Sequence, residues 1–175
     1  GSILRRRLID GAFRLDPDNP EANYAFGSVA VHRKDPSEAI PYFRRYAELR
    51  PGDERGPYAI GVALFLAKSY EAARTQLLPF AEREETAAGA SYLLARIARA
   101  ENEDEEALRF ARQAVEADPR SADGHSELGL LYQRLGQVER AEEALKRCLE
   151  IDPDHYLGNL HLLMLYSRTR DPRQA

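Results

Sequence analysis

A repeat of thirty-four residues constrains this chain more than any other feature. Glycine or alanine recurs at that interval in one column of the sequence, and alanine recurs in a second column. The first column contains Gly27, Gly61, Ala95 and Gly129, and the second contains Ala39, Ala73, Ala107, Ala141 and Ala175. A repeat of this length predicts a solenoid of helical hairpins. Since each hairpin packs only against its neighbours, a binding surface has to come from several hairpins together.

Two apolar stripes at helical spacing occupy each period, with a short polar turn between them, which predicts an antiparallel helix pair. In the first complete period we expect Asp35 to cap the second helix, Pro36 to occupy its first position and Glu38 to complete a capping box. That helix should end at Arg50-Pro51-Gly52, because proline disfavours helix at the preceding residue and glycine accepts a left-handed turn. The break recurs in one column, at Asp16-Pro17, Arg50-Pro51, Asp118-Pro119 and Asp152-Pro153.

Four complete repeats are predicted, at 20–53, 54–87, 88–121 and 122–155. Partial repeats at 3–19 and 156–175 flank them, which makes 1–175 a single array fragment of about ten helices. The first partial repeat matches only a second helix, and the last matches only a first helix. We therefore expect the chain to be part of a longer array, with a further helix opening at Asp171-Pro172.

The second half of the 54–87 repeat is less regular than the others. Glu85 stands where neighbouring repeats have proline, and Pro79 lies inside the helix predicted over 70–86. An interior proline removes one backbone hydrogen bond and presses on the preceding turn. We expect that helix to be kinked.

Recurring in register over four repeats, these columns resemble the tetratricopeptide repeat family, and the resemblance covers essentially the whole chain. One position before the glycine column, a further column contains Phe26, Ile60, Leu94, Leu128 and Leu162. The resemblance implies an all-α, right-handed superhelical solenoid of antiparallel helix pairs, in which the first helix of each pair lines a concave groove. The tryptophan that the family often has early in the first helix is replaced by Asn23, Pro57, Ser91, His125 and Asn159.

Composition argues against several classes of function. The net charge is -4 and the Arg5-Arg6-Arg7 triplet is too short for a basic tract, so nucleic-acid binding is not indicated. No apolar run is long enough to cross a bilayer, and we expect a soluble chain without membrane insertion. The compartment stays open between cytoplasm and periplasm, because a single cysteine cannot form an internal disulfide. Only three cationic residues are lysines, an arginine bias that suggests a bacterial source.

The residues that could carry catalysis do not form a recognisable constellation. The four histidines are scattered, and no pair has metal-ligand spacing with a carboxylate or cysteine beside it. Cys148 lies in a column of the second helices and is predicted to be a small buried residue. The acidic run 101–106 is interpreted as a solvated turn and helix start. We predict a protein that is not an enzyme and that needs no cofactor or metal.

A column of tyrosines indicates a binding surface. Tyr24, Tyr58 and Tyr92 follow one another at thirty-four residues, in a position that the family resemblance assigns to the concave side. Tyrosine offers an apolar face and a hydroxyl at low entropic cost, which suits it to binding extended peptides. The alternative is that these rings serve only local packing between helices.

Neighbouring columns add apolar and cationic side chains to this predicted groove. Arginines beside aromatic rings can receive a carboxylate in bidentate fashion or stack on a ring, although any one of them can simply be solvated. The predicted peptide-binding residues are Tyr24, Tyr58, Val62, Phe65, Leu66, Tyr92, Arg55, Arg96 and Arg99. Further along, the groove should become mixed in charge through Asp123, Glu127 and Arg134.

The predicted function is therefore that of a non-catalytic scaffold that holds a protein or peptide partner in its concave groove. One alternative is a substrate-positioning or regulatory arm of a larger bacterial enzyme. Another is an assembly scaffold that works through its ends.

The last predicted helix favours association of the chain with itself. It is apolar on nearly every face, whereas a terminal repeat needs a polar outer face to stay soluble. Its apolar residues are Tyr156, Leu157, Leu160, Leu162, Leu163, Met164, Leu165 and Tyr166. We expect a weak homodimer through this helix, caused by the missing partner helix.

Overall fold

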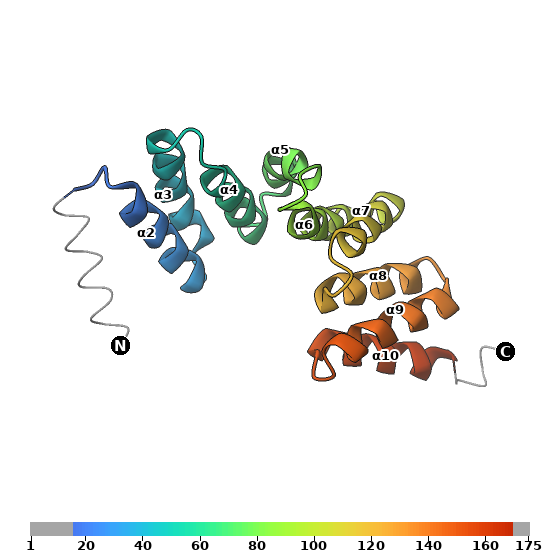
Figure 1. Cartoon of the computed structure of the whole chain (residues 1–175). Helices are drawn as coiled ribbons and strands as arrows, with labels where there is room; N and C mark the ends of the chain where they lie inside the picture. The colour runs from blue at the N-terminus through green and yellow to red at the C-terminus, as the bar shows by residue number, and fades with distance from the viewer. Residues whose placement is uncertain (1–15, 170–175) are drawn as a thin grey trace. The chain divides into compact units, whose positions relative to one another are not determined.

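The computed structural model describes residues 16–169, and within that range it contains nine α-helices and no strand (Figure 1). The helices are α2 (Pro20–His32), α3 (Pro36–Leu49), α4 (Arg55–Leu66), α5 (Tyr70–Ala81), α6 (Ala87–Ala100), α7 (Asp104–Ala117), α8 (Ala122–Arg134), α9 (Val138–Ile151) and α10 (Tyr156–Thr169). The helix predicted in the first partial repeat and the one opening at Asp171-Pro172 lie outside the described residues. The all-α fold of antiparallel helix pairs is confirmed.

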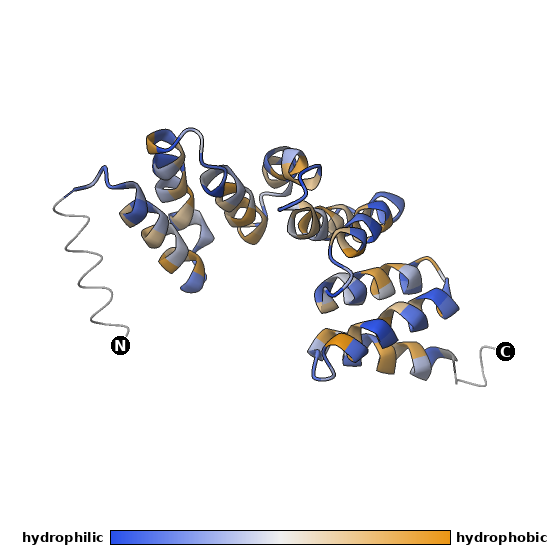
Figure 2. Cartoon of the chain, viewed as in Figure 1, coloured by the Kyte–Doolittle hydropathy of each residue, from blue (hydrophilic) through white to orange (hydrophobic). Residues whose placement is uncertain are grey.

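The chain forms two compact units, 1–77 and 78–175. In the first unit, α2 packs against α3, and α3 packs against α4. In the second, the hairpins α6–α7 and α8–α9 are joined through α7 and α8, and α10 packs against both helices of the second hairpin. Figure 2 shows hydrophobic residues spread along every helix and hydrophilic residues at most turns. The first helices α6 and α8 also contact each other, so the second unit has a surface made of first helices alone.

At the glycines of the small-residue column, the paired helices approach too closely for a side chain. A Cβ atom added to Gly27 would lie 2.5 Å from the Phe43 ring, and one added to Gly129 would lie 2.6 Å from Leu145. Gly61 meets Leu77 at 2.6 Å in the same way. Because real Cβ contacts are not this short, glycine is what permits the packing distance of these hairpins.

The start of α3 is partly as predicted. The Asp35 carboxylate accepts a hydrogen bond from the Glu38 amide at 3.1 Å, and Pro36 is the first helical residue. The predicted capping box is wrong, because the Asp35 amide donates to the Ala30 carbonyl and Glu38 forms an ion pair with Arg33. The preceding helix end thus uses the amide that the box would have needed.

The left-handed residues lie at a different turn from the predicted one. Gly52 does not have positive φ, whereas Lys34, Lys68, Asn102 and Gly136 do, with φ between 61° and 72°. These four residues recur every thirty-four positions, in the turn inside each hairpin. The residue after each donates its amide five residues back, for example from Asp35 to Ala30, which closes the end of the first helix.

Helix α5 ends at Ala81, five residues before the predicted end. Pro79 has no amide to donate to the carbonyl four residues back, yet α5 continues past it to Ala81. Side chains then bind the last carbonyl groups: the Thr86 hydroxyl donates to Phe80 at 2.8 Å, and the Gln113 side-chain amide donates to Ala81 at 2.7 Å. The helix therefore ends two residues after Pro79, and α7 supplies one of the donors for its last carbonyl groups.

The column that replaces the family tryptophan ties helices to the turns between repeats. Asn23, His125 and Asn159 each place a side-chain nitrogen 2.8–3.1 Å from the carbonyl of the turn proline six residues back. Pro57 cannot donate such a bond. The Ser91 hydroxyl is fully buried and has no hydrogen-bond partner in the described part of the chain. This hydrogen bond to the turn is therefore present at the starts of α2, α8 and α10, and it is absent at α4 and α6.

Candidate peptide-binding surface

In the first unit, Tyr24 belongs partly to the core. Its half-buried ring lies 5.4 Å from the Phe43 ring and 5.0 Å from the Tyr46 ring, measured between centroids. The Arg55 guanidinium of α4 covers the ring at 5.6 Å. Much of the Tyr24 ring is thus covered by side chains of the same unit, as expected if this tyrosine serves local packing between helices.

Arg55 is balanced by a carboxylate of its own chain. Its Nη2 lies 2.6 Å from Asp53 Oδ2, and the same carboxylate accepts a 2.5 Å hydrogen bond from the Tyr46 hydroxyl. The Arg55 guanidinium first, and the Tyr46 hydroxyl second, hold the pKa of Asp53 well below its ordinary value. This cluster positions the start of α4 beside Tyr24.

The remaining predicted residues of the first unit differ in exposure. Tyr58 and Val62 are half-buried, and burial raises the pKa of the Tyr58 phenol. Leu66 is exposed, at 45%. Phe65 is 8% exposed and packs against Tyr70 with ring centroids 6.1 Å apart, so it offers little surface to a ligand.

In the second unit, Tyr92 and Arg96 form a pair on one face of α6. The guanidinium lies 5.5 Å from the ring centroid, and its Nη1 lies 3.4 Å from the phenol oxygen. Tyr92 is half-buried, and burial is the main cause that raises its pKa. The pair combines an aromatic face with a cation, which is the combination predicted for the groove.

Arg99 binds Glu127 across the two first helices of this unit. The Nε–H of Arg99 donates to Oε1 of Glu127 at 2.5 Å, and the two side chains are 27% and 7% exposed. Burying a carboxylate without a cationic partner lowers the stability of the fold, because the charge loses its contact with water. Arg99 therefore compensates Glu127, and the sequence prediction placed both residues in the groove without pairing them.

Two histidines contact residues of α8 close to Glu127, although the sequence suggested no role for them. His161 Nδ1 of α10 lies 3.5 Å from the Ser126 hydroxyl, and His155 Nε2 lies 3.0 Å from Asp123 Oδ1. Burial lowers the pKa of His161. Both contacts follow the repeat spacing, since they join residues thirty-five and thirty-two positions apart, and that spacing was a usable signal.

We call this face of the second unit the inner surface and define it by Tyr92, Arg96, Arg99, Asp123, Ser126, Glu127 and His161. Its side chains come from three consecutive first helices, which are joined by the Arg99–Glu127 and Ser126–His161 contacts. It offers hydrogen-bond donors, acceptors and one aromatic face. Among residues 16–169 no group of three potential ligands could hold a metal ion.

Cys148 is buried, as predicted. Its side chain has no exposure and packs at the position where a Cβ on Gly158 would meet its sulfur. Burial raises the pKa of the thiol to about 11, so the reactive thiolate is disfavoured at neutral pH.

Two sequence profiles described as tetratricopeptide repeat match the chain, one at 122–155 and the other at 6–54 and 58–122. None of the described helices combines the length and hydropathy needed to span a membrane.

Relatives by sequence are much longer proteins. Cellulose synthase 2 operon protein C of Komagataeibacter xylinus is 27% identical over 177 aligned positions. The match covers 87% of this chain and 14% of that protein. The human protein O-mannosyl-transferase TMTC3 is 30% identical over 155 residues, covering 84% of this chain and 16% of the relative. A peptide N-acetylglucosaminyltransferase of Giardia intestinalis is 38% identical over 64 residues, covering 37% of this chain and 4% of the relative.

Solved structures share the fold over nearly their whole length. MamA of Desulfovibrio magneticus RS-1 has a TM-score of 0.72 at 24% identity, covering 89% of this chain and 88% of that one. YrrB, a tetratricopeptide repeat protein with an unusual peptide-binding site, has a TM-score of 0.69 at 27% identity, with 93% and 84% covered.

Proposed function

The chain belongs to the tetratricopeptide repeat family, and we propose that this protein–protein interaction scaffold binds an extended peptide on the inner surface of its second unit. The observation that carries the proposal is the Tyr92–Arg96 pair, a half-buried ring with a guanidinium 5.5 Å from its centroid. Aromatic and arginine side chains are the types most enriched at protein interfaces.

The charges of the surface favour a peptide with apolar or aromatic side chains and at least one carboxylate. Arg55 and Arg99 already bind carboxylates of the chain, Asp53 and Glu127. We assign the peptide carboxylate to Arg96, because its guanidinium lies 5.5 Å from the centroid of the half-buried Tyr92 ring and so combines a cation with an aromatic face. The peptide-binding site of YrrB, a protein of the same fold at 27% identity, supports a peptide as the ligand.

The test is titration of a partner, recovered from the source organism by pull-down, against the wild type and a Tyr92→Ala variant. Because a few residues usually carry the binding energy, this variant should weaken binding by about 2 kcal/mol. Arg96→Glu should also reduce affinity, and the loss should depend on salt concentration.

Tyr156→Ala serves as the matched control, since Tyr156 is 75% exposed and lies outside the inner surface. Circular dichroism establishes that each variant is folded. Undiminished affinity in the folded Tyr92→Ala variant would rule out the inner surface as the peptide site.

A second candidate function is that of an arm that positions substrate for a larger enzyme. Two of the relatives carry transferase names, and the matched segments span only 4% and 16% of their lengths. Determining the full-length sequence of the protein tests this candidate function. A catalytic domain beside the repeats would support it, and a product made of repeats alone would contradict it.

A further inference from the structure

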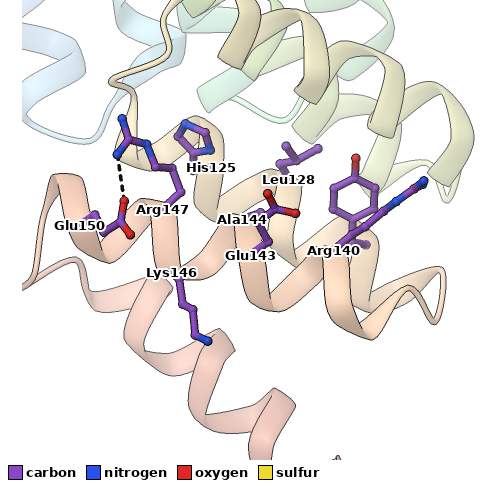
Figure 3. A pocket seen from close by; sticks show the side chains of 9 residues that line it. His125, Leu128, Arg140, Glu143, Ala144, Lys146, Arg147 and Glu150 are labelled. Atoms are coloured by element: carbon purple, nitrogen blue, oxygen red, sulfur yellow. Dashed lines mark hydrogen bonds and ion pairs between the residues drawn. The ribbon is translucent and has the colours of Figure 1, made fainter.

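A second hollow lies away from the inner surface, between helices α8 and α9. It has a volume of about 530 Å³ and a floor of largely buried side chains, Leu128, Tyr132 and Ala144. Figure 3 shows Arg140, Glu143 and Arg147 projecting from α9 beside this floor, with Lys146 turned away. At about 3.6 residues per turn, Leu128 and Tyr132 lie on roughly the opposite side of α8 from Ser126 and Glu127. We call this site the outer hollow.

Two guanidinium groups bracket the tyrosine of the outer hollow. Arg112 of α7 lies 5.6 Å from the centroid of the Tyr132 ring and donates from Nε to its hydroxyl at 3.1 Å. Arg140 of α9 lies 5.9 Å from the same centroid. The ring is 9% exposed, so it is held in place by the hairpin while both arginines stay at the surface.

Neither arginine has a carboxylate partner among the described residues. Arg112 has Tyr132 as its hydrogen-bond acceptor, and Arg140 donates to the Gln137 side-chain oxygen at 2.9 Å. The other cations of the hollow are different, since Arg147 pairs with Glu150 at 2.8 Å and Lys146 pairs with Glu142 at 2.7 Å. Positive charge without a counterion is thus concentrated around Tyr132, at one end of the hollow.

The repeat pattern does not require this combination. One period earlier, the positions of Tyr132, Arg140 and Arg112 are occupied by Ala98, Glu106 and Leu78. Two periods earlier they are occupied by Leu64, Ala72 and Arg44. An aromatic ring between two arginines therefore occurs in one of these repeats only, and hairpin packing alone does not explain it.

We propose that the outer hollow binds a peptide segment of a partner protein in which one acidic residue is flanked by bulky apolar residues. The carboxylate binds beside Tyr132, where Arg140 lines the hollow and Arg112 reaches the same ring from α7, because guanidinium groups bind carboxylates in a planar, charge-assisted geometry. The apolar side chains cover Leu128 and Ala144. Glu143, which also lines the hollow, disfavours ligands with clustered negative charge, such as a phosphate group.

The experiment uses two blocked tripeptides, Ac-Phe-Glu-Leu-NH2 and Ac-Phe-Gln-Leu-NH2, titrated into the whole 15N-labelled chain and followed by NMR. The glutamate peptide should shift amide signals of α8 and α9 around Leu128 and Ala144. Losing one charge-assisted contact costs about tenfold in affinity, so the glutamine peptide should bind about tenfold more weakly. Arg140→Gln and Arg112→Gln should each produce a similar loss with the glutamate peptide.

Arg44→Gln is the matched control, because Arg44 is the counterpart of Arg112 two periods earlier and has Leu64 where Arg112 has Tyr132. Its affinity should equal that of the wild type. The affinity is read from the amide signals around Ala144 of α9, which lines the outer hollow, and this readout separates the site from the one proposed above. Equal affinity for the two peptides, no measurable binding, or shifts confined to the inner surface would each overturn the proposal.

Discussion

The turn inside each hairpin depends on one residue with a left-handed backbone. Lys34, Lys68 and Asn102 occupy that conformation without being glycine, and Gly136 occupies it as glycine. A side chain in this region clashes with its own backbone at a cost of about 1–2 kcal/mol. Three of the four hairpins therefore carry strain that the fourth avoids.

Replacing Lys68 or Asn102 by glycine should stabilise the protein. Relief of the strain outweighs the larger chain entropy that glycine loses on folding, and we expect a net gain of about 0.5–1 kcal/mol in the free energy of unfolding. Urea unfolding measures the change. Gly136→Ala should have the opposite sign, and an unchanged midpoint in all three variants would show that these residues are not strained.

At the scale of helices, the packing distance of a hairpin is set where glycine faces the partner helix. Gly129 leaves no room for a side chain, because a Cβ there would also come within 3.3 Å of the Ala141 carbonyl. A backbone atom cannot rotate away as a side chain can. The packing distance between α8 and α9 therefore requires glycine at position 129.

Gly129→Leu should overpack the α8–α9 hairpin and destabilise the protein by about 1–3 kcal/mol. Since packing in a solenoid is between nearest neighbours, most of the damage should stay within α8–α10. Thermal unfolding tests this. Gly52→Leu is the control, because a Cβ at Gly52 has no neighbour within 4 Å. Equal melting temperatures for Gly129→Leu and the wild type would show that the column is not a helix–helix contact.

At the scale of the whole molecule, most of the exposed large apolar residues in the described part of the chain lie on α10. Its exposed apolar residues are Tyr156, Leu157, Leu160, Leu163 and Met164, with exposures from 37% to 75%. Leu163 falls in the column where earlier repeats have glycine or alanine, and it is 66% exposed. A second helix could not pack on α10 at the distance seen at Gly129 without displacing this side chain.

We predict that the chain forms a weak homodimer through α10. Sedimentation velocity over a range of concentrations should reveal it, and Leu163→Glu should abolish it by placing a charge in the apolar contact. Leu78→Glu is the control, since Leu78 is similarly apolar and 43% exposed but lies on α5. A chain that stays monomeric at the highest concentration would contradict the prediction.

Much of the helical pattern could be predicted because its signals are local. The end of α3 before Arg50-Pro51 follows from backbone sterics at one residue pair. The first turn of α3 follows from Asp35 and Pro36 in the same way. The end of α5 could not be predicted, because Gln113 of another helix supplies a hydrogen bond to its last carbonyl.

The candidate site was predictable in part. Tyr92 and Arg96 lie on the same helix four residues apart, so helical geometry alone places them together. The Arg99–Glu127 pair and the two arginines at Tyr132 join different helices, and their partners depend on how those helices pack.

The thirty-four-residue repeat by itself determined the number and order of the described helices and the residues at which paired helices touch. It could do so because proline, glycine and apolar spacing act within one or two turns of chain. The tertiary structure alone decided which cations are neutralised by Asp53 and Glu127 and which remain without a carboxylate around Tyr132. Side-chain pairing depends on distances of a few ångströms between helices, and no local pattern in the sequence contains those distances.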